Sequence, residues 1–305
     1  MTKAALLMNP ASGQSDAETY KDQLNHVLSS QYDQFDIIET DPDQAIEDQT
    51  SQLADAGYEA IYLMGGDGTI NGGIAGISDR PKSDRPKIGV IPQGTVNNFA
   101  RMLGMSTNVN EAIDQLKATH TDYLDLGQIN DQYFVSSVSA GAIPETVQDV
   151  DDDEKEKLGP LAYIIEGVKA LGSEETYQFN FDLDGEQTSY DLSMLVVGLG
   201  NSMLGIENFF ADQSLQDGTL ALMGLKETSV LEKISVIPDL FKEEADYSQF
   251  LVVKTFEAGT IDIVSDQAHP TTVDGDQGPD FPIKLACLPK HIEFILPDQA
   301  AQGVS

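Results

Sequence analysis

A short apolar run, followed by a polar turn and a helix-like stretch, recurs through the N-terminal part of this sequence, and this pattern constrains the fold more than any other feature. It occurs at "KAALLMNPASGQ" before a predicted helix over residues 16–28, at "FDIIETD" before 42–56, at "AIYLMGGDGT" before 69–77, and at "KIGVIPQGT" before 96–103. Four strand-then-helix units favour a parallel sheet with right-handed crossovers, in which ligands bind at the carboxyl ends of the strands. We therefore predict an α/β fold with a parallel sheet for this part of the chain.

The pattern changes after about Asp122, where alternating, strand-like segments are joined by turn dipeptides. Asn130-Asp131 and Asp184-Gly185 are the clearest hairpin signals. Two helix-like stretches interrupt these strands, over 158–171 and 230–241, and the acidic run over 149–157 is expected to be a solvated loop or helix start. Because 305 residues are enough for two domains, we predict a second, antiparallel domain.

The charge balance argues against a nucleic-acid partner. The chain carries 51 acidic and 17 basic residues, a formal net charge of -34, and shows no basic stripe. Phosphate backbones are bound through Lys and Arg, and anionic membranes would also repel this surface. Since the Debye length falls to about 3 Å in strong salt, a high-salt cytoplasm is a hypothesis consistent with this composition.

The apolar runs of the sequence argue against a membrane-spanning protein. They are only a few residues long, as in Ala4–Met8, so we predict no membrane span, and the N-terminus lacks the features of a signal peptide. We expect a cytoplasmic protein.

The single cysteine, Cys287, excludes an internal disulfide, and together with four scattered His it offers no zinc-site spacing.

The stretch "IYLMGGDGTINGG", Ile61–Gly73, places a carboxylate inside a glycine turn between a strand and a helix. Gly65, Gly66 and Gly68 allow close approach of the backbone to a ligand, and Thr69 could cap the helix, whose first amides favour an anion. Asp67 would repel a phosphate there unless a cation bridged them, which predicts Mg²⁺ or a Mg²⁺-bound water. The alternative is that Asp67 only stabilises a tight turn.

Two further corners resemble the first. "IPQGTVNNFAR" has Gly94 and Thr95 at its turn, and "MNPASG" precedes the first helix. Three such corners in this order resemble the diacylglycerol kinase and sphingosine kinase family of lipid kinases, and above all the soluble bacterial diacylglycerol kinases. Gly-Gly-Asp-Gly-Thr by itself also occurs in NAD kinases and phosphofructokinases. The resemblance to lipid kinases therefore depends on the two other corner motifs.

The resemblance covers nearly the whole chain. "LGPLAYIIEGVKAL" resembles the helix after the family's acidic loop, "LVVGLGN" and "QDGTLALMGL" resemble the segment that holds a structural Mg²⁺, and "TTVDGDQG" occupies the place of a C-terminal Asp-Gly-Glu. It implies a Rossmann-like ATP-binding domain over 1–123 and an antiparallel β-sandwich domain for the lipid substrate over 124–289. The last strand, near 290–298, would return to the first domain.

The resemblance also implies the site residues. The proton acceptor would be Asp274 or Asp276, facing the nucleotide across a cleft, with Asp67 as a further catalytic carboxylate. A structural Mg²⁺ would take Asp217 with backbone oxygens of Ser214 and Thr219, linked through water to Asp125. ATP would be held by residues of the three corners and by Thr40, namely Asn9, Pro10, Ala11, Ser12, Gly13, Thr40, Gly65, Gly66, Asp67, Gly68, Thr69, Ile70, Asn71, Gly72, Gly94, Thr95 and Asn97.

Several of these residues have a second interpretation. Asp217-Gly218 could be only a hairpin turn, and Thr40 could be only a helix cap before Pro42. Asp184-Gly185-Glu186 resembles the catalytic triplet in its letters, but we interpret it as a turn in a symmetrical hairpin.

The chain also departs from the family pattern. Asn98 stands where many relatives have Asp, Gln14, Ser15 and Asp16 replace basic residues, and Asp276 replaces a Glu that is one methylene longer. General-base catalysis depends on reach at a scale of roughly 3 Å.

The predicted function is an ATP-dependent lipid kinase that phosphorylates the hydroxyl of diacylglycerol to give phosphatidic acid. It would act peripherally at the inner face of the membrane. Two alternatives remain open at this stage: a nucleotide-binding regulatory protein that has lost catalysis, and a kinase of a soluble substrate such as NAD. The sequence leaves the acyl preference open, and it does not decide between a monomer and a homodimer.

Overall fold

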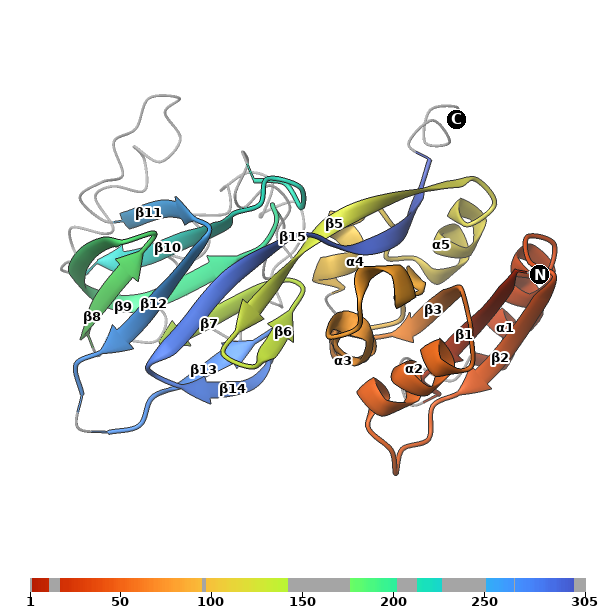
Figure 1. Ribbon diagram of the computed structural model, residues 1–305, viewed down its shortest axis with the longest axis horizontal. Helices are drawn as coiled ribbons and strands as arrows, with labels where there is room; N and C mark the ends of the chain where they lie inside the picture. Colours follow the sequence, from red (N-terminus) through yellow and green to blue (C-terminus); the bar gives the residue numbers. More distant parts are fainter. Residues whose placement is uncertain are drawn as a thin grey trace. The chain divides into compact units, whose positions relative to one another are not determined.

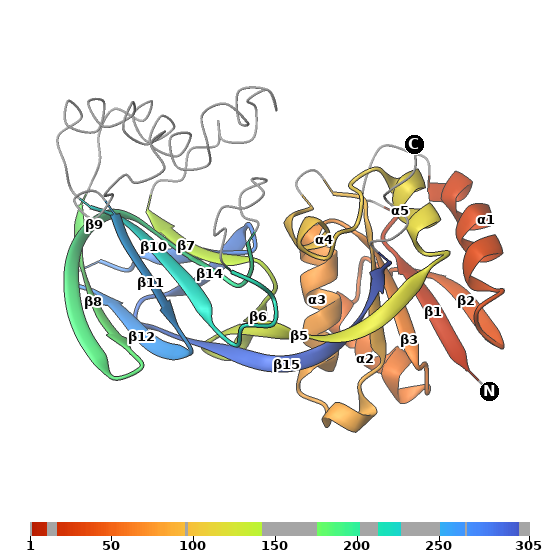
Figure 2. The same cartoon turned by 90° about the horizontal axis from the view of Figure 1, so that it is seen from above.

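The computed structural model describes residues 2–10, 17–94, 97–141, 176–201, 213–226, 251–265 and 267–298 (Figures 1 and 2). The chain divides into two compact units, one formed by Met1–Leu126 with Leu288–Ser305 and the other by Gly127–Cys287. The helices predicted over 158–171 and 230–241, and the acidic run over 149–157, lie outside the described residues. No helix in the described ranges is long and apolar enough to cross a bilayer.

The first unit contains a parallel sheet with the strand order β15-β4-β3-β1-β2. Its strands are β1 (Lys3–Met8), β2 (Gln34–Glu39), β3 (Ala60–Gly65), β4 (Lys87–Pro92) and β15 (Ile283–Pro297), whose residues Phe294 and Ile295 pair with β4. Its helices are α1 (Ala17–Leu28), α2 (Ile46–Asp55), α3 (Asp67–Ser78), the 3₁₀ helix η1 (Lys82–Asp84), α4 (Asn98–Met102) and α5 (Val109–Gln115).

The strand order creates a topological switch point between β1 and β3. All of β3 and nearly all of β1 and β4 are buried, as expected for the inner strands of a parallel sheet covered on both faces. From β1 the chain moves to one side to form β2, and then to the other side for β3 and β4. Right-handed crossovers therefore place α1 on one face and α2 with α3 on the other, as Figure 2 shows.

Glycines on α3 allow it to pack closely against α2. A Cβ atom at Gly72 would collide with the side chain of Ile46, and one at Gly76 would collide with the main chain of Glu47. Each glycine lowers helix propensity by about 1 kcal/mol relative to alanine. The α3 helix thus gives up some propensity for a close contact with its neighbour.

The second unit is built from antiparallel strands. The long strand β9 pairs with β8 through its first half and with both β7 and β10 through its second half. It therefore connects the row β14-β13-β7-β9 to the row β9-β8-β12-β15 (Figure 1). The bounds are β5 (Thr119–Ile129), β6 (Gln132–Phe134), β7 (Ser137–Gly141), β8 (Tyr177–Leu183), β9 (Glu186–Gly198), β10 (Leu220–Lys226), β11 (Leu251–Phe256), β12 (Ala258–Ile263), β13 (Pro270–Val273) and β14 (Asp276–Asp280).

Three two-residue hairpin turns in this unit are stabilised in the same way. Asn130, Asp184 and Asp274 each open a turn with a positive φ, of 50°, 52° and 50°. In each case the side-chain oxygen accepts hydrogen bonds from main-chain N–H groups of a segment far away in the sequence. Asn and Asp tolerate this backbone region better than other non-glycine residues, so one residue both forms the turn and anchors it.

Some predicted helix boundaries are wrong. The α2 helix begins at Ile46 and its N-cap is Ala45, so Thr40 does not cap a helix that starts at Pro42. The α3 helix begins at Asp67 with Gly66 as its N-cap, which excludes Thr69 as the cap. A local extended backbone at Gly66 decides this start, and the apolar periodicity does not reveal it.

The helices after β4 were also predicted incompletely. The α4 helix starts at Asn98, later than predicted, because Asn97 has a left-handed φ of 54°. The prediction missed α5 altogether. Its N-cap Asn108, which accepts bonds from the main-chain N–H of Asn110 and Glu111, is a start signal that the sequence does contain.

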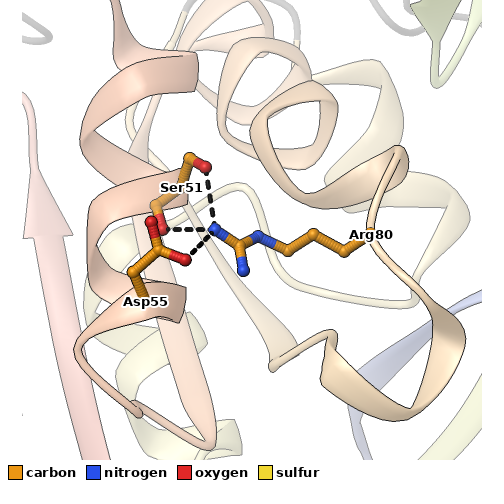
Figure 3. Close-up of polar contacts among 3 residues, drawn as sticks. All are labelled: Ser51, Asp55 and Arg80. Carbon is orange, nitrogen blue, oxygen red and sulfur yellow. Dashed lines mark hydrogen bonds and ion pairs between the residues drawn. The ribbon is translucent and has the colours of Figure 1, made fainter.

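Arg80 joins the loop after α3 to α2 (Figure 3). Its Nη2 donates to the carbonyl oxygen of Ser51 at 2.9 Å and to Ser51 Oγ at 3.0 Å, and it lies 2.6 Å from Asp55 Oδ1. The Asp55 side chain is 69% exposed, whereas that of Arg80 is 22% exposed. Water therefore weakens the ion pair more than the hydrogen bonds to Ser51.

We expect Arg80→Ala to lower the free energy of unfolding by about 1–2 kcal/mol, because it leaves the Ser51 carbonyl without this donor. Asp55→Asn removes only the charge of an exposed partner and should cost less than about 0.5 kcal/mol. Urea unfolding of both variants and the parent measures the difference. An equal loss in the two variants would mean that the ion pair dominates.

Candidate functional site

The carboxyl ends of the parallel strands carry most of the residues predicted to bind a nucleotide. Asn9 follows β1, Thr40 follows β2, and Gln93 follows β4. Each of the three donates its main-chain N–H to a carbonyl at the end of a neighbouring strand, at 3.0, 2.9 and 2.8 Å respectively. The hydrogen-bond ladder thus continues into the loops and holds them together at the switch point, where open α/β sheets bind ligands.

The turns after β3 and β4 contact each other through their backbones. A Cβ atom at Gly94 would lie 2.7 Å from the Cα of Gly66, so the turn after β4 leaves no room for a side chain at Gly94. The buried amide of Asn97 closes the second turn, because its Oδ1 accepts from Gly94 N at 2.8 Å and its Nδ2 donates to Gly94 O at 2.8 Å. The predicted site residues Gly66, Gly94 and Asn97 are therefore brought together.

The N-terminus of α3 lies at the corner after β3. Its N-cap, Gly66, is extended and offers no side-chain hydrogen bond. Thr69 Oγ1, in the first turn, accepts a hydrogen bond of 3.1 Å from Asn9 Nδ2, which connects the corner after β1 to the one after β3. Uncapped amides at the start of a helix favour an anion such as a phosphate.

Asp67 joins the two turns electrostatically. Burial raises the pKa of its carboxyl above the usual range, while hydrogen bonds from the main chain of Phe99, Asn98 and Asn97 and the nearby charge of Arg101 act in the opposite direction. The carboxylate thus accepts from the amides at the start of α4, where the helix dipole favours a negative charge. It does more than stabilise its own turn.

Three oxygens at these corners are buried and have no hydrogen-bond partner among the described residues: Asp67 Oδ1, Asn71 Oδ1 and Gln93 Oε1. Asp67 and Asn71 are one turn apart on α3, and Gln93 immediately precedes Gly94. Buried polar atoms in native proteins are nearly always paired. Oxygen acceptors of this kind suit Mg²⁺ or the N–H groups of a ligand, so the residues present fit a nucleotide with its cation.

Other predicted nucleotide contacts have packing roles. Ile70 is fully buried in the core, and Gly72 makes room for Ile46 of α2. Gly65 accommodates the side chain of Thr69, 2.6 Å from where its Cβ would lie, while Pro10 and Gly68 are exposed. Ala11, Ser12, Gly13 and Thr95 lie outside the described residues.

The predicted structural metal ligands belong to different units. Asp217 is exposed, and its Oδ2 accepts from Ser214 N at 2.7 Å, while the carbonyl of Thr219 accepts from Gln213 Nε2 at 2.8 Å. Asp125, in the first unit, is buried and accepts from Lys290 N at 2.8 Å. Within the described ranges no three His, Cys, Asp or Glu side chains form a metal-binding group.

The two candidate proton acceptors have different surroundings. The carboxylate of Asp274 accepts hydrogen bonds from the main-chain N–H of Val135, Ser136 and Ser137, each at 2.8 Å. Asp276 is the first residue of β14 and is exposed, and its carboxylate has no hydrogen-bond or ion-pair partner within the described residues. Only Asp276 therefore presents an unoccupied carboxylate.

Comparisons with known proteins cover both units. Residues 3–129 match the family described as "Diacylglycerol kinase catalytic domain", and residues 136–296 match "YegS C-terminal NAD kinase beta sandwich-like domain". The chain is 31% identical to a diacylglycerol kinase of Staphylococcus carnosus over 97% of this chain and 95% of that one. It is 30% identical to a diacylglycerol kinase of Bacillus subtilis over 99% of both.

A solved structure shows the same fold. The crystal structure of a diacylglycerol kinase from Bacillus anthracis superposes with a TM-score of 0.78 at 24% identity, over 98% of each chain. The predicted fold class, an α/β unit with a parallel sheet followed by an antiparallel β-sandwich-like unit, is confirmed.

The raised pKa of Asp67 predicts a pH-dependent stability. Because burial disfavours the charged carboxylate, the folded protein loses stability as the pH rises above the usual carboxyl range, and this cost is absent at lower pH. Asp67→Asn is nearly isosteric and keeps an acceptor oxygen for the amides of α4. We expect its melting temperature at neutral pH to equal or exceed that of the parent.

The difference between the two melting temperatures should shrink as the pH falls toward about 4, where an ordinary carboxyl becomes protonated. Paired thermal unfolding of the parent and the variant across this range measures it. A parent that is more stable at neutral pH, and that loses this advantage on acidification, would show that the charged hydrogen bonds outweigh the burial.

Proposed function

The chain belongs to the diacylglycerol kinase catalytic-domain family of lipid kinases, and we propose that it transfers the terminal phosphoryl group of ATP to the free hydroxyl of diacylglycerol, giving phosphatidic acid. The matched family model and the two similar diacylglycerol kinases confirm the family and the lipid kinase function predicted from the sequence. The observation that supports the mechanism best is the joined pair of glycine turns at the switch point, with Asp67 between them.

The first unit would hold the nucleotide. The uncapped amides of α3 and the backbone of Gly66 and Gly94 are suited to phosphate oxygens, and Asn9 positions Thr69 beside them. Bound ATP supplies the phosphoryl group, and Mg²⁺ would neutralise its oxygens. The unpartnered oxygens of Asp67, Asn71 and Gln93 would bind that cation, its waters, or N–H groups of the ligand.

The second unit would supply the base. Asp276, exposed at the start of β14, would take the proton from the lipid hydroxyl as the hydroxyl oxygen attacks the terminal phosphorus of ATP and ADP leaves. The acid is shorter than the Glu of the family pattern, so its position must compensate for one methylene. We further propose that the enzyme acts in the cytoplasm and contacts the inner face of the membrane peripherally.

A substrate panel tests this function. Dispersed diacylglycerol, other hydroxyl-bearing lipids and NAD are each incubated with labelled ATP, and the phosphorylated products are separated. Phosphatidic acid is the expected product. Phosphorylation of NAD but of no lipid would support a kinase of a soluble substrate, and ATP binding without any product would support a regulatory protein.

We expect Asp67→Asn to reduce kcat by about 100-fold or more, because the neutral side chain can no longer stabilise a cation at the phosphates. Asp276→Asn should reduce kcat to a similar degree, whereas Asp276→Glu should change it modestly. Thermal unfolding of all three variants controls for folding. A folded Asp67→Asn protein with the turnover of the parent would exclude the cation role of this carboxylate.

The loop from Ser214 to Thr219 gives a separate test of the structural metal. Asp217→Asn keeps an acceptor for Ser214 N–H but lacks the charge that attracts Mg²⁺. If Asp217 binds Mg²⁺, the ion at about 100 times its Kd should stabilise the parent by about 2.7 kcal/mol, and the variant much less. The melting temperatures with and without Mg²⁺, in the absence of ATP, measure this. Equal Mg²⁺ stabilisation of both proteins would leave Asp217 a hairpin residue.

A further inference from the structure

Asp274 is bound more tightly to the main chain than a hairpin turn alone requires. Its Oδ2 accepts from Val135 N, and its Oδ1 accepts from both Ser136 N and Ser137 N, each at 2.8 Å. Its own N–H donates to the carbonyl of Ser137 at 2.8 Å. Three successive amides around one carboxylate form an anion-binding nest, and charge-assisted bonds of this kind are roughly twice as strong as neutral ones.

The hairpin that Asp274 opens is held by few strand pairings, although Thr271 and Val273 of β13 are buried. The strand β13 pairs with β7 at only two positions, Thr272 with Ser139 and Val273 with Val138, and among the described strands β14 pairs with β13 alone. Gly275 has a φ of 99° and open space around it, so it contributes conformation and no contact. The place of the turn therefore depends strongly on the carboxylate of Asp274.

Asp276 follows this turn directly and pairs with Val273 across it. A rotation of the turn would displace the Asp276 carboxylate, which has no partner of its own within the described residues. Asp274 is itself poorly suited to receive a proton, because an added O–H would face amide N–H groups and break bonds that the anion makes.

We propose that Asp274 is a positioning residue, which clamps the β13–β14 turn to the connection between β6 and β7 and so fixes the carboxylate of Asp276. This inference rests on the proposed function, in which Asp276 accepts the proton of the lipid hydroxyl. It assigns different roles to the two acids of the Asp-Gly-Asp triplet.

The chain contains a matched control in Asp184. This residue also opens an Asp-Gly turn with a φ of 52°, donates its N–H to Ala258 O at 2.9 Å, and accepts from Glu257 N and Ala258 N at 2.9–3.1 Å. It differs in that its turn leads to Glu186, which is paired with Lys254 at 2.7 Å and is outside the proposed site.

The test compares Asp274→Asn, Asp274→Ala, Asp184→Asn and Asp276→Asn with the parent on dispersed diacylglycerol. A misplacement of about 1 Å can cost about 100-fold in rate, so we expect a loss of this order in kcat for both Asp274 variants, with the KM for ATP unchanged. The acid limb of the pH–rate profile should persist in the Asp274 variants, because they still contain the base Asp276. It should disappear in Asp276→Asn, which lacks that base. Asp184→Asn should lower the melting temperature as Asp274→Asn does, and keep the kcat of the parent.

Three results would overturn the inference. Loss of the acid limb in Asp274→Asn would make Asp274 the base, and parent-like kcat in both Asp274 variants would remove its role. A loss of kcat in Asp184→Asn as large as in Asp274→Asn would show that lower stability of the protein, and not the position of Asp276, causes the loss of kcat.

Hydrogen exchange separates this inference from the proposed function. The amides of Val135, Ser136 and Ser137 should exchange faster in Asp274→Ala than in the parent and in Asp184→Asn, whether or not the protein phosphorylates a lipid. Unchanged exchange of these amides would overturn the clamp even in an active enzyme. A parent that phosphorylates no lipid would instead overturn the proposed function, while faster exchange in Asp274→Ala would still support the clamp.

Discussion

The buried carboxylate of Asp67 links the two turns that form the candidate site of the first unit. It begins α3 and accepts from the amides that begin α4, so one side chain holds the turns after β3 and β4 against each other. The two turns meet through glycines, since Gly94 leaves no room for a Cβ beside Gly66. Burying the charge is unfavourable, and the amides of Asn97, Asn98 and Phe99 offset part of that cost. Such a cost is typical of a site that has been shaped for binding.

The sequence predicts the parallel sheet well because each inner strand is an apolar run followed by a glycine or polar turn. It predicts less about how the corners interact. Nothing in the spacing of Asp67 and Phe99 indicates that they meet, since that contact depends on the neighbouring positions of β3 and β4 in the sheet. The roles of Ile70 and Gly72 were missed for the same reason: one turn of a helix carries both ligand-facing and core-facing residues, and only the packing of α2 decides which is which.

The two Asp-Gly turns show a second limit of local reasoning. Asp184-Gly185 and Asp274-Gly275 have nearly the same letters and the same backbone conformation, and the sequence predicts a turn at the first correctly. What distinguishes them is the set of amides that each carboxylate meets, which lies 73–74 residues away for Asp184 and 137–139 residues away for Asp274. A role that depends on such distant partners can be recognised only when the fold is known.

Main-chain amides are the hydrogen-bond partners of several carboxylates in this protein, whose composition provides few basic side chains. With 51 acidic and 17 basic residues, most carboxylates have no Lys or Arg to pair with. The acids that shape this protein take their partners from the backbone: Asp184 from Glu257 and Ala258, Asp217 from Ser214, Asp125 from Lys290, and Asp274 from the β6–β7 connection. Salt screens an exposed ion pair, but it has little effect on a hydrogen bond to a neutral amide held in a fixed turn. The anchors of the fold and of the candidate site therefore do not depend on low ionic strength, although the surface around them is strongly acidic.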